Sequence, residues 1–179
     1  MKINDQSGQF TGPAELRIVR ILPGPIERIW DYLTDPGKRS RWFAGGPMEL
    51  RPGGKFTLHF RHKDLAPDET PPEQYEQHSM DGVVTRCEPP RLLAYTFGSD
   101  GESEVTFELT PQGKDVQLVL THRATGGDLP YMADFGSGWH THIAHLIALL
   151  EGAPRPPFWA LHTKLKADYE KLRIAAQKS

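Results

Sequence analysis

One stretch of the chain, residues 136–152, limits what the rest of the sequence can fold into. Its large apolar side chains recur at three- and four-residue spacing, so they share one face of a helix. They are Trp139, Ile143, Leu146, Ile147 and Leu150. Ser137 suits the N-cap of this helix, Gly152 suits its C-terminal end, and Pro154 blocks its continuation. A face this apolar must be buried, so the rest of the chain has to cover it.

The middle of the chain has the alternating pattern of antiparallel strands. Residues 55–62 show it clearly, with Phe56, Leu58 and Phe60 on one face and polar side chains on the other. The connections between these segments are short enough for hairpins. Strands are expected at residues 15–22, 55–62, 79–87, 91–97, 103–110 and 115–122. A sheet with one apolar face is therefore the surface that covers the central helix.

Helices and loops surround this predicted sheet. Two short helices are expected at residues 25–33 and 36–43, and a last helix at 158–175. Residues 63–77 are rich in proline and acidic side chains, which predicts a long loop. The chain is expected to divide into a flexible N-terminal segment, a main domain and a C-terminal helical extension, at residues 1–13, 14–152 and 153–179.

Composition excludes several classes of function. The chain has 179 residues, of which 37% are hydrophobic and 25% charged, as in an ordinary soluble globular protein. Its net charge of −2 argues against a nucleic-acid partner, because phosphate binding needs a concentrated basic face. No apolar run is long enough for a membrane span, and residues 1–9 do not look like a signal peptide, so we expect a cytoplasmic protein. Cys87 is the only cysteine, which excludes an intrachain disulfide.

Several segments, in this order and spacing, carry a resemblance to a known group of proteins. They are residues 21–36 (ILPGPIERIWDYLTDP), 41–43 (RWF), 51–56 (RPGGKF), 87–97 (CEPPRLLAYTF) and 138–152. The chain resembles the START-like superfamily, also called SRPBCC or Bet v 1-like, and within it the family named after the C-terminal domain of the activator of Hsp90 ATPase. The resemblance implies an α+β helix-grip fold, in which a curved antiparallel sheet wraps around a long C-terminal helix and leaves a cavity between them.

Aromatic and aliphatic side chains predicted to face the helix are the candidates for lining that cavity. The candidate ligand-binding residues are Trp42, Phe56, Leu58, Phe60, Tyr95, Phe97, Phe107, Trp139, His142, Ile143 and Leu146. The same side chains could instead fill a closed core. The leading hypothesis is binding of an apolar small molecule in the internal cavity, with no catalytic residue, no cofactor and no metal.

Two other functions stay open at this point. One is an enzyme of the cyclase or hydratase type, in which His142 and Tyr95 would do acid–base work. The other is a chaperone-interaction module, which the family name suggests. For the last helix, the apolar stripe from Phe158 to Leu172 either packs on the domain's own surface or forms a homodimer contact.

The remaining histidines are not expected to bind a metal or to catalyse. His140 and His145 fall off the apolar stripe of the central helix, which places them at the solvent or at a boundary. A helical zinc site has two histidines four residues apart with a glutamate between them, and this pattern is absent. Surface or rim positions are expected for His59, His62, His122 and His162.

Overall fold

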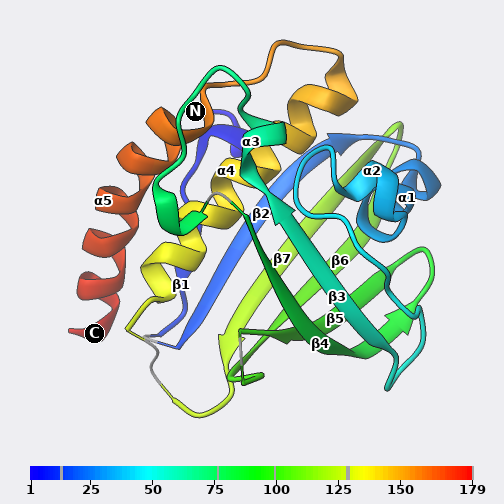
Figure 1. Ribbon diagram of the computed structural model, residues 1–179, viewed down its shortest axis with the longest axis horizontal. Helices are drawn as coiled ribbons and strands as arrows, with labels where there is room; N and C mark the ends of the chain where they lie inside the picture. The colour runs from blue at the N-terminus through cyan, green and yellow to red at the C-terminus, as the bar shows by residue number, and fades with distance from the viewer. Residues whose placement is uncertain (13, 76, 99, 128–129, 179) are drawn as a thin grey trace.

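The computed structural model describes residues 1–12, 14–75, 77–98, 100–127 and 130–178. A seven-stranded antiparallel sheet, ordered β1-β2-β7-β6-β5-β4-β3, curls around helix α4 (Met132–Glu151) (Figure 1). The strands are β1 (Gln9–Phe10), β2 (Glu15–Pro23), β3 (Lys55–Arg61), β4 (Gln77–Glu88), β5 (Leu92–Phe97), β6 (Ser103–Gln112) and β7 (Asp115–Ala124). The predicted α+β helix-grip fold is confirmed.

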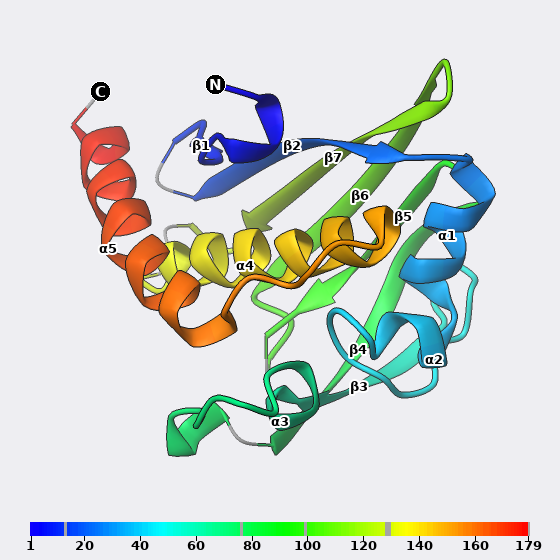
Figure 2. The ribbon, with the colours of Figure 1, turned by 90° about the horizontal axis from the view of Figure 1, so that it is seen from above.

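Short helices interrupt the first half of the chain, and two long helices follow the last strand. Two short helices follow β2, as predicted, and a final helix packs on the outside of α4 (Figure 2). Besides α4, the helical elements are η1 (Ile3–Asp5), α1 (Ile26–Thr34), α2 (Pro36–Arg39), α3 (His62–Leu65), η2 (Glu73–Tyr75) and α5 (Phe158–Gln177). Among the described residues, no helix is both long and apolar enough to span a membrane.

The inner face of the sheet is built from alternate residues of neighbouring strands, as the strand pattern predicts. In the register, Leu93 of β5 lies opposite Phe107 of β6, and Phe107 lies opposite Leu120 of β7. These side chains are buried, together with Ile143 and Leu146 of α4. The sheet and the helix thus share one hydrophobic core.

Helix α4 starts earlier than the sequence suggested. It begins at Met132, so Ser137 is not its N-cap but lies inside the helix, where its hydroxyl donates to the Asp134 carbonyl at 3.1 Å. Gly136 lies at a close helix contact, because a Cβ there would meet the Tyr169 ring at 2.4 Å. Gly152 ends the helix with a φ of 65°, as predicted for a left-handed C-terminal residue.

Helix α2 is shorter than the predicted segment 36–43, and Arg39 is the reason. Although a charged side chain favours a solvated position, that of Arg39 is 1% exposed. Its guanidinium donates to the carbonyls of Thr34, Ala44 and Gly46. These hydrogen bonds satisfy backbone carbonyl groups of the turns that flank the short helix.

The apolar stripe of α5 is covered within the chain. Leu165 and Tyr169 belong to the same core as the sheet, whereas Leu172 is 37% exposed. The N-terminal segment meets this helix too, since the Gly8 amide donates to the Tyr169 hydroxyl at 2.8 Å. Of the two predicted alternatives, the structure therefore shows packing on the domain's own surface, and a dimer would need another surface of α5.

Candidate ligand pocket

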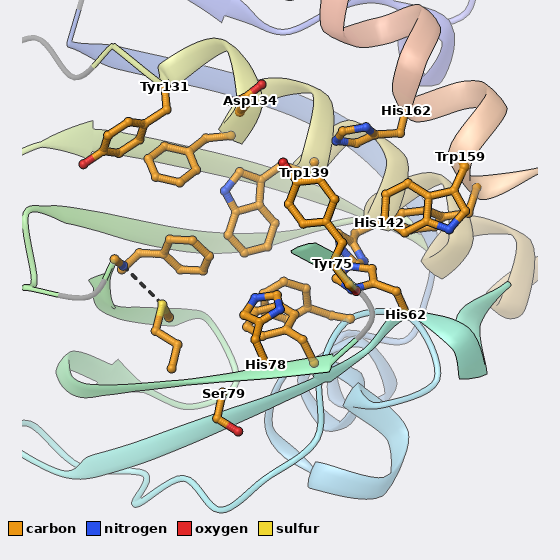
Figure 3. Close-up of a pocket in the computed structure, with 18 of the residues that line it drawn as sticks. His62, Tyr75, His78, Ser79, Tyr131, Asp134, Trp139, His142, Trp159 and His162 are labelled. Carbon is orange, nitrogen blue, oxygen red and sulfur yellow. Dashed lines mark hydrogen bonds between the residues drawn. The ribbon is translucent and has the colours of Figure 1, made fainter. Parts of the chain in front are cut away.

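A pocket of about 540 Å³ opens at one end of the grip. Its walls come from the sheet, from α4, from His62 and Tyr75 in the connection between β3 and β4, and from the start of α5 (Figure 3). Its volume lies within the range of small-molecule sites, roughly 300–1,000 Å³. Aromatic rings form most of its lining.

The predicted ligand-binding residues divide between this pocket and the core. Phe60, Phe97, Trp139 and His142 line the pocket. The others are buried in the core and do not line it: Trp42, Phe56, Leu58, Tyr95, Phe107, Ile143 and Leu146. For this second group, the structure favours the alternative that they fill a closed core.

Tyr95 shows why the core is closed where the helix meets the middle of the sheet. Its ring lies 5.0 Å from the Phe56 ring and 5.8 Å from the Phe107 ring, centroid to centroid, and is 2% exposed. Burial raises the pKa of its hydroxyl. Because Tyr95 is outside the pocket, the suggested acid–base pair of His142 and Tyr95 is not brought together there.

Sequence reasoning missed the outer wall of the pocket. This wall consists of Tyr75, which ends η2, and of Trp159 and His162 on α5. The Tyr75 and Trp159 rings are stacked, with centroids 5.7 Å apart. Both segments were recognised in the sequence as a long loop and an extension, but nothing in their patterns said that they meet.

Glu69 fastens these two segments together. Its carboxylate accepts the Phe158 amide at 2.6 Å and the Trp159 amide at 2.9 Å. Amides in the first turn of a helix have no partner within the helix, and a carboxylate there also interacts favourably with the helix dipole. A residue of the loop therefore caps α5 from a distance of about 90 positions in the sequence.

Two pocket histidines are held neutral with a fixed tautomer. The Nδ1–H of His142 donates to the Trp42 carbonyl at 2.8 Å, and that of His62 donates to the Tyr75 carbonyl at 2.8 Å. Burial lowers the pKa of His62 to about 4 and holds the pKa of His142 well below its usual value. The expectation that His62 is a surface or rim residue was wrong, because strand β3 ends at Arg61 and His62 turns inward at the start of α3.

His122 fixes the floor of the pocket. Its Nδ1 accepts the Trp139 indole N–H at 2.8 Å, so its other nitrogen carries the proton toward the Ser103 hydroxyl at 2.7 Å. The Ser103 hydroxyl in turn donates to the Phe97 carbonyl. His122 is fully buried, which lowers its pKa to about 3, so its predicted surface position was wrong.

His140 and His145 were also wrongly placed at the solvent side, because α5 and its linker cover them. The Nδ1 of His140 accepts the Tyr169 hydroxyl at 3.0 Å, and the Nε2–H of His145 donates to the Pro156 carbonyl at 3.0 Å. Within the described part of the chain, no three His, Cys, Asp or Glu side chains lie close enough together to hold one metal ion.

This architecture defines the class of the protein. A curved antiparallel sheet that grips a C-terminal helix and leaves a pocket at its end is the helix-grip fold of the START-like, or SRPBCC, superfamily. Within that class, the chain belongs to the family of Activator of Hsp90 ATPase homolog 1-like proteins, whose profile matches residues 23–151. The resemblance seen in the sequence is thereby confirmed.

Solved structures share the fold. The protein encoded by gene BPP1335 from Bordetella parapertussis is 42% identical, with 95% of this chain and 92% of that chain covered and a TM-score of 0.79. CalU16 from Micromonospora echinospora is 24% identical, with 89% and 88% covered and a TM-score of 0.66. DynU16, a protein of the dynemicin biosynthetic locus, is 20% identical, with 79% and 49% covered and a TM-score of 0.63. No curated protein matches the chain.

Proposed function

We propose that the pocket binds a neutral, largely apolar small molecule with a hydrogen-bond donor. The observation that carries this proposal is the pair of neutral imidazoles in an aromatic pocket. Because Nδ1 of both His62 and His142 donates to a carbonyl, the Nε2 atom of each ring is an acceptor. Neither Nε2 has a hydrogen-bond partner among the described residues, and neither is sealed from the pocket.

Trp159 contributes a hydrogen-bond donor, whereas the two imidazoles contribute acceptors. Its indole N–H is buried and has no acceptor among the described residues. A buried donor without a partner costs about 1–3 kcal/mol, which a ligand carbonyl or ether could recover after a small side-chain shift. The ligand class is therefore an apolar body, flat enough to lie between aromatic rings, with one donor and one acceptor group.

The carboxylates of the lining do not change the preference for a neutral ligand. Asp134 pairs with Lys166 at 3.1 Å, and Asp81 accepts the Thr57 hydroxyl at 2.6 Å. Both acidic groups thus already have partners. An anionic ligand would find no lysine or arginine among the described lining residues, and the charge of Asp134 is already balanced by Lys166.

Gly138 supplies a direct test. It lines the pocket, and a Cβ there would meet nothing within 4 Å. We expect the Gly138→Leu side chain to occupy part of the pocket and obstruct ligand binding, whereas Gly138→Ala keeps the pocket open on the same helix. The measurement is native mass spectrometry of both variants and the unchanged protein, purified from the original host.

A small molecule retained by the unchanged protein and by Gly138→Ala, but lost from Gly138→Leu, would support the proposal. A circular-dichroism melt checks that both variants are folded. Equal retention by all three proteins would place the ligand elsewhere. No retained molecule in any of them, together with no binding in a screen of apolar fluorophores, would contradict small-molecule binding and favour the protein-interaction alternative.

A further inference from the structure

A second cleft, of about 320 Å³, has Phe43 in common with the lining of the ligand pocket. Three arginines line it, and they come from separate parts of the chain. Arg41 follows α2, Arg61 ends β3, and Arg155 lies in the linker between α4 and α5. The fold thus gathers three guanidinium groups that the sequence keeps far apart.

The positive charge of this cleft is not neutralised within the described residues. Asp64 is the carboxylate among the lining residues, and it pairs with Arg61 at 3.1 Å. Arg41 reaches only the neutral hydroxyl of Tyr32, at 3.4 Å, and Arg155 has no ion pair with a described residue. The chain as a whole carries a net charge of −2, so the cleft is a local reversal of sign. A cleft lined by one sign of charge concentrates ions of the opposite sign.

The floor of the cleft is apolar. Phe43, Ala44 and Leu65 line it and are buried. The Phe43 ring packs against the rings of Trp139 and His142, with centroid distances of 4.8 Å and 5.1 Å. The cleft therefore combines a cationic rim with a firm carbon surface.

We propose that this cleft binds a soluble phosphate monoester. A phosphate dianion accepts the paired N–H groups of guanidinium forks, and several arginines can share its oxygens. The apolar floor would take the carbon body of the ester, and the volume suits a small molecule rather than a polymer. This site does not rest on the proposed function, because its lining shares Phe43 and no other described residue with the ligand pocket.

The test is a titration of the full chain with phenyl phosphate, followed by amide chemical shifts in two-dimensional NMR. We expect saturable shifts at Ala44, Gly45 and Arg155, and weaker binding of inorganic phosphate, which lacks the ring. Arg155→Gln and Arg41→Gln should each raise the Kd about tenfold, as for loss of one charge-assisted contact.

Two further variants test the opposite change and a position outside the cleft. Asp64→Asn removes the carboxylate of the cleft and should lower the Kd severalfold. Arg91→Gln is the matched control, since Arg91 is exposed and pairs with Glu88 at 2.7 Å outside the cleft. Its Kd should equal that of the unchanged protein.

Several results would overturn the proposal. They are the absence of saturable shifts, equal effects of Arg155→Gln and Arg91→Gln, or shifts centred on Trp139 instead of Ala44. Vesicles containing phosphatidic acid form a second arm. Co-sedimentation that depends on Arg155 would make a lipid headgroup the source of the phosphate and would overturn the soluble ligand.

Discussion

The middle of the grip and its pocket end have similar rings but different packing. Around Tyr95 and Phe107 the rings fill the space between sheet and helix, whereas around Phe97 and Trp139 they leave a pocket. The difference in packing comes from the residues that face the rings. Gly138 offers no side chain, and the outer wall comes from loop and extension rather than from the sheet. Aromatic content alone therefore does not distinguish a binding site from a core.

Truncation of one ring in each region should give the largest difference in unfolding free energy. Phe107 is 1% exposed, so Phe107→Ala should cost about 3–5 kcal/mol of unfolding free energy. Phe97 borders the pocket, so Phe97→Ala should cost only about 1–2 kcal/mol, because less of its ring is packed. Urea unfolding measures both. Equal losses would show that the pocket end is as tightly packed as the core.

Two glycines of α4 should respond in opposite directions. Gly136→Ala places a methyl group 2.4 Å from the Tyr169 ring and should destabilise by about 1–3 kcal/mol. Gly138→Ala meets open space and should stabilise by about 0.5–1 kcal/mol, because alanine is the better helix former. Thermal melts of the pair provide the comparison, and a shift of the same sign in both would refute the close contact between α4 and α5.

The buried histidines should make the protein acid-sensitive. The pKa is about 3 for His122 and about 4 for His62 and His140 in the fold, below the ordinary value near 6.5, so the unfolded chain binds more protons. Their stabilising effect is complete above pH 6.5 and is lost as the pH falls toward these values.

The expected slope is up to about 1.4 kcal/mol per pH unit for each such histidine. His122→Gln, which keeps an acceptor for Trp139, should reduce the slope between pH 6 and 4 by up to this amount. Unfolding free energies in urea at several pH values measure it. An unchanged slope would mean that His122 is not buried in its neutral form.

The smallest effect is expected at the outer wall. Glu69→Ala removes the acceptor of two amides and should cost about 1 kcal/mol, with faster hydrogen exchange at Phe158 and Trp159. Asp68→Ala is the control, since this neighbouring side chain is exposed. If the two variants behave alike, Glu69 does not fasten the wall.

The architecture could be predicted from the sequence because it depends on periodicity. The alternation in residues 55–62 and the stripe on α4 each report burial of one face, and β3 and α4 appear there. The candidate site was only partly accessible to this reasoning. Phe60, Phe97, Trp139 and His142 line the pocket, but periodicity says which side chains point inward, not where the interior is incompletely filled.

The histidines show a second limit. His140 and His145 lie off the apolar stripe, and they are nevertheless buried because α5 covers that face. His62 and Tyr75 are brought to the pocket by a loop without a repeating pattern. Contacts between irregular segments far apart in the chain leave no periodic signal, so such placements need the folded structure.

The hydrogen bonds of Glu69 to the start of α5 have a consequence for how the pocket can vary within this fold. The family profile ends at residue 151, whereas Trp159 and His162 of the pocket wall lie beyond it. Part of the pocket wall therefore comes from residues outside the segment that the family profile matches. Exchanging the pocket-facing residues of α5, with Leu165 and Tyr169 kept in the core and Glu69 kept in the loop, is expected to reshape the pocket and leave the grip intact.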